Sequence, residues 1–316
     1  MTTTIPEQLK KFQEMVDASR SRVARLPHRI WLFGGQFAED STKQPRSIRE
    51  AFNRSALRRT YPWIADIARP EDYPDWLQFS GYQDLLLFER DAGFLSRAIV
   101  LFPESEGAIA ELGAFSLDDQ LHKRLFVVVS RRYREHPLRQ SFVNLGPLRR
   151  LESIKSNDES LPANICVIDS EKPSELTVAE LDIVFRDLDA WLTVGHKTER
   201  FRKENPTHKL LLIADLVDLL QVLSEQHLLE ALRHFGIEAA RPEIRRLGKL
   251  LDLLGLVRIA ERGSETFFVS LRAKGAPLLE YDAVEGRRFD RLSFKAKTWL
   301  SVKGDPHLGP LLERAR

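Results

Sequence analysis

Glu111 is the residue whose surroundings most suggest covalent chemistry. It lies in PESEGAIAELGAF, residues 103–115, directly after the apolar run AIVLF. On a helix that begins near Ser105 or Glu106, Glu111 would share a face with Ala108 and Phe115. A carboxylate in such an apolar wall suits a nucleophile that attacks a sugar carbon, as in retaining glycoside-cleaving enzymes. A solvent-facing Glu among small residues explains the position equally well, so the spacing leaves both interpretations open.

The elements that must position Glu111 are short apolar runs alternating with helical patterns. Such alternation indicates a parallel sheet covered on both faces. It predicts a Rossmann-like or flavodoxin-like α/β domain over residues 1–170, opened by a helix over 6–25. The expected strands are RIWLFGG (29–35), AIVLF (98–102), LFVVV (125–129) and NICVID (164–169), with helices over 47–57, over 85–98 and after PES.

Two features follow strands of this predicted sheet, where ligands of open parallel sheets bind. Gly34 and Gly35 end the first strand and would let the backbone approach a ligand closely. PESEG opens the helix after AIVLF, and its first amides would favour an anion. Both features can also be tight strand-to-helix turns. For FGG the turn is the preferred interpretation, because FGG is neither GxGxxG nor a phosphate-binding loop with lysine.

The second half of the chain has a different pattern. Residues 171–206 predict a long helix that connects two domains, with Thr177 and Glu180 as a capping box and Pro206 as its stop. Residues 207–316 then predict three helices, a hairpin around RGSE and a C-terminal tail. Three helices with a two-stranded wing form a winged helix-turn-helix, so we expect an α-rich winged-helix domain here.

Basic residues mark the third of these helices and the wing. Across residues 241–274 there are eight basic residues against four acidic ones. A winged helix usually places its third helix in the major groove, so contacts with nucleic-acid phosphates are expected. A protein-interaction module with a solvated basic face is an equal alternative, and the Leu-rich segment 208–223 favours an additional homo-oligomer interface. The candidate nucleic-acid residues are Arg241, Arg245, Arg246, Lys249, Arg258 and Arg262.

Composition limits the class of protein. The 43% hydrophobic and 30% charged content is typical of a folded protein, and no stretch approaches the ~20 apolar residues of a membrane helix. The polar N-terminus does not resemble a signal peptide, the single cysteine excludes an internal disulfide, and no Cys/His cluster has zinc spacing. We therefore expect a cytoplasmic protein without a structural metal, and we expect no cofactor. Net charge is +2, but residues 20–60 hold ten Lys/Arg against three Asp/Glu. Such patches suit phosphate-bearing partners, although a solvated surface is the plainer explanation.

The motif PESEGAIAELGAF resembles the signature of the nucleoside deoxyribosyltransferase-like superfamily, in which a loop and helix present a nucleophilic glutamate. A longer resemblance is to the deoxyribosyltransferase-like effectors of bacterial retrons. Their pattern appears here as Gly34–Gly35, RPEDY, IVLFPESEGAIAELGAF and SFVNLGPLRRL, in that order over residues 29–152. The match to their C-terminal winged-helix region is looser.

This resemblance implies roles for individual residues. Glu111 would be the nucleophile, forming a glycosyl intermediate that water releases, and Glu89 would orient the substrate. Ser105 stands where the transferases usually have a base-contacting aspartate, which argues against deoxyribosyl transfer and for hydrolysis of another N-glycoside. Glu71 and Asp72 could instead form a turn or helix cap, and Asn144 could instead satisfy backbone groups in its loop. The substrate-binding candidates are Gly34, Gly35, Glu71, Asp72, Glu89, Ser105 and Asn144.

The resemblance also implies a biological role. Retron effectors are toxins restrained by a reverse transcriptase and its branched RNA–DNA product, and they are released during phage infection. Some are linked with cleaving the nicotinamide–ribose bond of NAD, whose leaving group departs neutral and needs no general acid. The resemblance therefore implies a retron effector toxin that hydrolyses NAD or another nucleotide.

Two other functions compete with this one. The chain could be a nucleotide-sensing transcription regulator, whose α/β domain binds without turnover and whose winged helix binds DNA. It could also be a structural partner of a nucleoprotein complex, which predicts neither catalysis nor sequence-selective binding.

Overall fold

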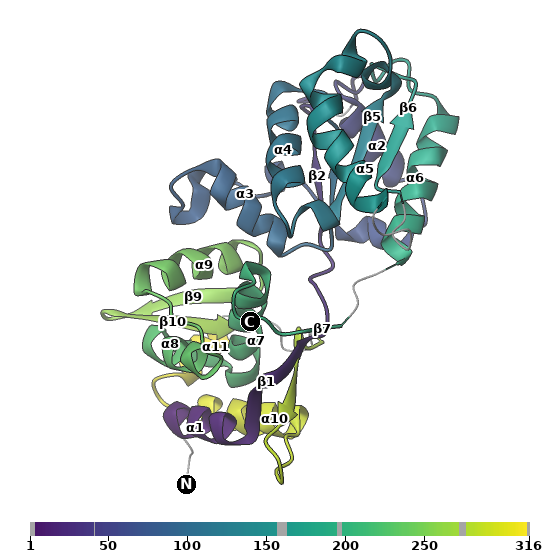
Figure 1. Cartoon of the computed structure of the whole chain (residues 1–316). Coiled ribbons are helices and arrows are strands. Elements are labelled where there is room, and N and C mark those ends of the chain that lie inside the picture. The colour runs from purple at the N-terminus through teal and green to yellow at the C-terminus, as the bar shows by residue number, and fades with distance from the viewer. Residues whose placement is uncertain (1–3, 41, 157–162, 195–197, 272–275, 315–316) are drawn as a thin grey trace. The chain divides into compact units, whose positions relative to one another are not determined.

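The computed structural model describes residues 4–40, 42–156, 163–194, 198–271 and 276–314 (Figure 1). The chain divides into two compact units. The first, called the α/β unit, is drawn from residues 27–76 and 89–196. The second, called the composite unit, is drawn from residues 1–26, 77–88 and 197–316.

A five-stranded parallel sheet forms the centre of the α/β unit. The apolar runs predict four of its strands, and the fifth, Ile67–Ala68, is not among the expected ones. Its strands lie in the order β3-β2-β4-β5-β6, and every neighbouring pair is parallel. Numbered within the unit this order is 2-1-3-4-5, which is that of flavodoxin-like doubly wound sheets. The strands are β2 (Ile30–Phe33), β3 (Ile67–Ala68), β4 (Ala98–Leu101), β5 (Leu125–Ser130) and β6 (Ile165–Ile168).

Helices pack on both faces of this sheet. The helices are α2 (Ile48–Ala56), α3 (Leu85–Phe94), α4 (Glu106–Leu117), α5 (Arg149–Ser156) and α6 (Val178–Thr193), and residues 85–88 of α3 belong to the composite unit. On one face α2 and α6 form a core with the strands, in which the Phe52 and Phe185 rings stack at 4.6 Å. On the other face the Phe115 ring of α4 meets the Phe33 ring of β2 at 5.5 Å. Burial on both faces explains why β2, β4 and β5 are almost continuously apolar.

The N-terminal residues differ from the prediction of one helix over 6–25 in a domain 1–170. Helix α1 (Ile5–Met15) ends early, and β1 (Val16–Val23) follows it. Strand β1 pairs antiparallel with β11 (Leu279–Ala283) and with β7 (Glu199–Arg200), so residues 1–26 belong to the composite unit. The partners of β1 come from the far end of the chain, and local periodicity carries no information about them.

The segment predicted as a connecting helix over 171–206 also folds differently. Its helix, α6, begins at the expected Thr177 cap but ends at Thr193. Val184, Phe185 and Leu188 of α6 are buried in the sheet core, and the Trp63 indole donates to Asp189 at 2.9 Å. Helix α6 is therefore the last helix of the α/β unit, and β7 rather than a helix precedes Pro206; residues 195–197 lie outside the described ranges.

The composite unit contains two small antiparallel sheets, β11-β1-β7 and β8-β10-β9. The predicted helices and hairpin are present as α7 (Pro206–Leu220), α8 (Glu225–His234), α9 (Arg241–Leu253), β9 (Val257–Arg262) and β10 (Glu265–Ser270). Strand β8 (Val222–Ser224) lies between α7 and α8 and completes the hairpin sheet. The expected tail instead contains β11 and two helices, α10 (Arg291–Lys303) and α11 (Gly309–Arg314).

Candidate functional site

The candidate site lies at the carboxyl ends of β2 and β4, the neighbouring strands whose connections run to opposite sides of the sheet. Helix α2 follows β2 and leads to β3, whereas α4 follows β4 and leads to β5. At such a switch point the loops diverge and leave a crevice, which is where open α/β sheets bind ligands. The two loops carry Gly34–Gly35 and PESEG, as the sequence predicts.

Both glycines are required by close packing of these two loops. Gly34 has φ +149°, and a Cβ there would lie 2.9 Å from the Phe102 Cβ. A Cβ on Gly35 would lie 2.8 Å from the Ser47 Cβ and 3.0 Å from Glu104. The close packing of the two strand ends thus gives the glycines a structural reason that is independent of binding.

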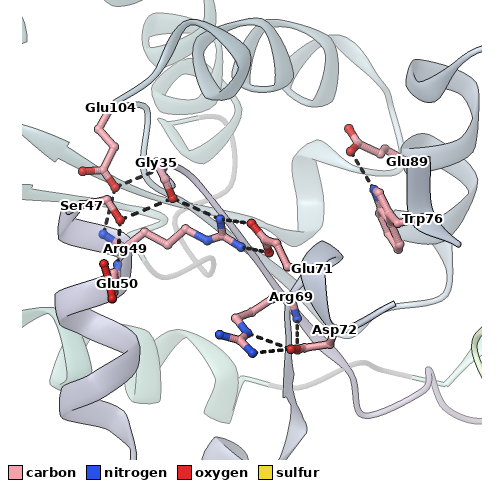
Figure 2. Close-up of polar contacts among 10 residues, drawn as sticks. All are labelled: Gly35, Ser47, Arg49, Glu50, Arg69, Glu71, Asp72, Trp76, Glu89 and Glu104. Carbon is pink, nitrogen blue, oxygen red and sulfur yellow. Dashed lines mark hydrogen bonds and ion pairs between the residues drawn. The ribbon is translucent and has the colours of Figure 1, made fainter. Parts of the chain in front are cut away.

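Glu104 occupies the anion-binding position at the start of α2. Its carboxylate accepts hydrogen bonds from the backbone amides of Gly35 at 3.2 Å and Arg49 at 2.9 Å (Figure 2). It also accepts one from the Ile48 amide at 2.7 Å. A helix N-terminus of this kind often holds a phosphate, but here the chain supplies its own anion. This role of Glu104 is not visible in the sequence, because the three donors lie 55–69 residues away and no local motif connects them.

Arg49 and Glu71 form a bidentate ion pair beside Gly35. The Arg49 guanidinium donates to Glu71 at 2.8 and 2.6 Å and to the Gly35 carbonyl at 3.2 Å (Figure 2). It also lies over the Phe37 ring at 4.7 Å. The Arg49 side chain is only 3% exposed, and its Nε has no hydrogen-bond partner among the described residues. Burial acts to raise the pKa of Glu71, but the contacts with Arg49 outweigh it and hold that pKa below its ordinary value. Glu71 is among the substrate-binding residues predicted from the sequence, whereas Arg49 is not.

Glu89 is a buried carboxyl on α3. It accepts a hydrogen bond from the Trp76 indole at 3.1 Å (Figure 2). Burial raises its pKa to about 7, although the Trp76 hydrogen bond acts in the opposite direction and the charge of Glu71 adds to the increase. A carboxyl with this pKa can gain or lose a proton at neutral pH, which suits acid–base chemistry.

Glu111 lies on α4, whose start the sequence predicts correctly. Ser105 caps the helix by accepting from the Ala108 amide at 3.2 Å, and Ala108, Leu112 and Phe115 of the same helix are buried. The residue is half-buried, but its Oε2 atom is buried and has no hydrogen-bond partner in the described part of the chain. Burial and then repulsion by Glu89 raise the pKa of Glu111 to about 8, with Arg49 opposing and Glu71 adding to the increase. Glu111 therefore lies within electrostatic range of Glu89, Arg49 and Glu71.

These two raised pKa values predict a pH-dependent stability of the α/β unit. The unfolded chain releases both protons near the ordinary glutamate pKa of 4.5, whereas the folded unit keeps them to about 7 and 8. The folded unit thus binds more protons between pH 4.5 and 8, so its stability should fall as pH rises through that window. Denaturant unfolding of wild type and Glu111→Gln at pH 5 and pH 9 checks this. The decrease in the free energy of unfolding from pH 5 to pH 9 should be smaller in the variant than in wild type. Equal decreases would contradict the assignment of the raised pKa to Glu111.

Three other substrate candidates have partners within the protein. Ser105 is the α4 cap, so its hydroxyl is already engaged. Asp72 forms a capping box and an ion pair with Arg69, which supports the turn interpretation (Figure 2). The Asn144 side chain accepts from Arg134 at 3.0 Å and donates to the Arg139 carbonyl at 2.9 Å, which satisfies loop backbone.

The six basic candidates of the composite unit also have contacts. Arg241 and Arg245 pair with the buried Glu225 of α8 at 3.4 and 2.6 Å. The Arg246 guanidinium lies over the Tyr82 ring at 4.8 Å, and exposed Lys249 packs near Gly81. In or beside the hairpin, Arg258 lies 3.7 Å from Asp252 and Arg262 donates to the His307 carbonyl. Part of the charge of α9 is thus compensated internally.

Neither a metal site nor a membrane span is found in the described part of the chain. No group of three or more His, Cys, Asp or Glu side chains there could hold a metal ion. No described helix is long and apolar enough to cross a membrane.

Comparison with known proteins gives a family match and two relatives. The model of the STM3845 retron effector protein family matches residues 45–259, more than half of the chain. A retron Ec86 protein of Escherichia coli, named as a candidate ribosyltransferase/DNA-binding protein, is 30% identical over 145 residues, or 46% of this chain and 44% of the relative. A retron Ec73 protein of Escherichia coli with the same description is 29% identical over 100 residues, 32% of this chain and 30% of the relative. The matches thus span less than half the length of these relatives.

Proposed function

The chain belongs to the STM3845 retron effector family, and from that premise we propose that its α/β unit hydrolyses an N-glycosidic bond of a nucleotide, with NAD as the favoured substrate. Both relatives are named as candidate ribosyltransferases, which share with this reaction the cleavage of a bond to the sugar C1′ carbon. The observation that carries the proposal is the buried, unpartnered Oε2 of Glu111 at the switch point of the sheet. A nucleophile needs an oxygen that the protein itself does not use.

In the proposed reaction Glu111 attacks the ribose C1′ carbon. A bond forms between its carboxylate oxygen and C1′ while the C1′–nitrogen bond breaks, and the bonding electrons neutralise the nicotinamide ring as it leaves. Water then attacks C1′ and releases the Glu111 carboxylate. The proton of that water passes to solvent or to Glu89, whose pKa of about 7 suits a proton acceptor at neutral pH.

The charge of the site favours a cationic leaving group. The charges of Glu71 and Glu89 act on Glu111, and the cation that opposes them at Glu111 is Arg49, which is paired with Glu71. A positively charged ring near Glu89 and Glu111 would lower both pKa values and ionise the nucleophile. A neutral nucleoside lacks this charge, so NAD is preferred over ordinary nucleosides. Because Glu104 fills the amide cradle at the start of α2, we place the substrate phosphates elsewhere in the crevice.

A product assay tests this activity. The full chain is incubated with NAD and, in parallel, with deoxynucleosides plus a free acceptor base, and products are separated by chromatography. We expect nicotinamide and ADP-ribose in equal amounts and no base exchange. Transfer of deoxyribose to the acceptor base would contradict NAD hydrolysis. So would the absence of NAD cleavage by the purified chain if expression of the same chain stops cell growth.

We further propose that α7, β8, α8, α9, β9 and β10 form a winged helix that contacts nucleic acid. The order helix, strand, helix, helix, strand, strand and the Arg262–Glu265 turn between β9 and β10 support it, as does the description of both relatives as DNA-binding. The proposed partners are the reverse transcriptase and its RNA–DNA product, which would restrain the toxin until infection. The same features would serve a nucleotide-sensing regulator that binds DNA without catalysis, and turnover of NAD distinguishes the two.

A further inference from the structure

The composite unit contains a groove between α1 and α10 that the proposed function does not use. Its volume is about 700 Å³, within the range of ligand-binding pockets. Its walls are fixed by the protein core: the Phe12 ring of α1 lies 5.9 Å from Phe289 and 6.1 Å from Phe294 at the start of α10. Helix α10 is also tied to α7 by Arg291 and Lys295, which pair with Asp215 and Asp218. The groove is therefore preformed.

Three cations line the groove without a counterion. Lys11, Arg288 and Lys297 are exposed, and none of them forms an ion pair or side-chain hydrogen bond within the residues the structure describes. The carboxylate in the lining is Asp290, which caps α10 by accepting from the Ser293 amide at 3.1 Å. This differs from α9, where two arginines share the carboxylate of Glu225.

The remaining lining is partly apolar and partly hydroxylic. Met15, Phe294 and Leu300 line it, and Leu300 is 63% exposed although it is aliphatic. Ser293 and Ser301 add hydroxyls. Cations that can bind phosphates beside an apolar surface that can receive a base are the combination that single-stranded nucleic acids require.

We propose that the α1–α10 groove binds single-stranded nucleic acid through its phosphates. The concave form favours one strand, whereas a duplex is bound through the grooves between its strands by a protruding helix or hairpin. This surface is separate from the proposed winged-helix contact on α9, and it does not depend on any activity of the α/β unit.

Anisotropy titration of the full chain with a fluorescein-labelled oligothymidine over a series of salt concentrations tests the proposal. Lys11→Glu combined with Lys297→Glu should weaken binding by about tenfold or more at low salt and lower the salt slope by about 1.4, the value for two lost contacts to a single strand. The matched control is Lys10→Glu combined with Lys303→Glu, which makes the same charge change on the same helices outside the groove. The control should bind within about threefold of wild type.

Each other outcome counts against the proposal. Equal loss in both double variants would show only general electrostatic attraction. Unchanged binding in the groove variant, or loss confined to a labelled duplex, would assign the contact to another surface such as α9. Competition by free ATP at equal phosphate concentration would assign the groove to a nucleotide. Circular dichroism confirms that each variant is folded.

Discussion

Glu111→Gln is expected to reduce N-glycoside hydrolysis by about 10³-fold or more and to abolish growth inhibition on expression. Gln keeps the shape and size of the side chain but has no carboxylate to form the glycosyl intermediate. The substitution removes a group whose ionisation is disfavoured by burial, so the fold should persist and become more stable above pH 8. Lost activity in a protein of equal or greater stability separates catalysis from folding. The measurements are NAD turnover by the purified chain and NAD content of expressing cells.

The matched control is Glu106→Gln on the same helix. Glu106 is exposed at the first turn of α4, whereas Glu111 has a buried carboxylate oxygen. The Glu106 variant should keep its activity within about threefold of wild type, because an exposed first-turn carboxylate contributes only through the helix dipole. Full toxicity and full NAD loss in Glu111→Gln cells would exclude Glu111 as the nucleophile. Equal loss in both variants would point to damage to α4.

Asp215→Ala is expected to destabilise the composite unit by about 3–5 kcal/mol. Asp215 on α7 is fully buried and accepts from the Arg291 guanidinium at 2.7 and 3.0 Å, the Tyr281 hydroxyl at 2.7 Å and the Leu278 amide at 2.8 Å. These bonds hold β11 and α10 against α7. Removing the carboxylate leaves the mostly buried Arg291 with its weaker contact to Asp218, at 3.2 Å, and with the Tyr281 ring at 5.7 Å. A buried charge that loses its partner is costly, so the effect should exceed that of breaking an exposed ion pair.

Hydrogen exchange resolved by peptide provides the measurement, because it reports each unit separately. Faster exchange is expected in α7, α10 and β11, while β2, β4 and β5 keep wild-type protection. Asp282→Ala is the control: its 3.5 Å contact with Arg20 is exposed and should contribute about 1 kcal/mol or less. Unchanged protection of α7 in Asp215→Ala would show that the buried pair does not stabilise the unit.

Much of the α/β unit could be predicted from local sequence. Strands β2, β4 and β5 are apolar at nearly every position because both faces of a parallel sheet are covered, and that pattern is visible without partners. Helices α2 and α4 begin at Ser47 and Ser105, whose hydroxyls cap them as their residue type suggests. The position of Glu111 after β4 follows directly from these boundaries.

The charges around Glu111 could not be predicted in the same way. The Arg49–Glu71 pair joins α2 to the short turn Pro70–Asp72, and Glu104 reaches amides from two other segments. Whether the arginines of α9 face solvent or a carboxylate also depends on Glu225, from the preceding helix. Each of these contacts joins residues that no spacing rule relates.

Local sequence thus determined the apolar strands, the capped helices and the place of Glu111 on α4, because burial pattern and capping act between residues a few positions apart. Tertiary structure alone decided that β1 pairs with β7 and β11, that α6 belongs to the sheet, and that Glu111 shares its surroundings with Glu89, Arg49 and Glu71. The physical reason is that strand pairing, desolvation and Coulomb interactions depend on distance in space, and only the folded chain sets those distances.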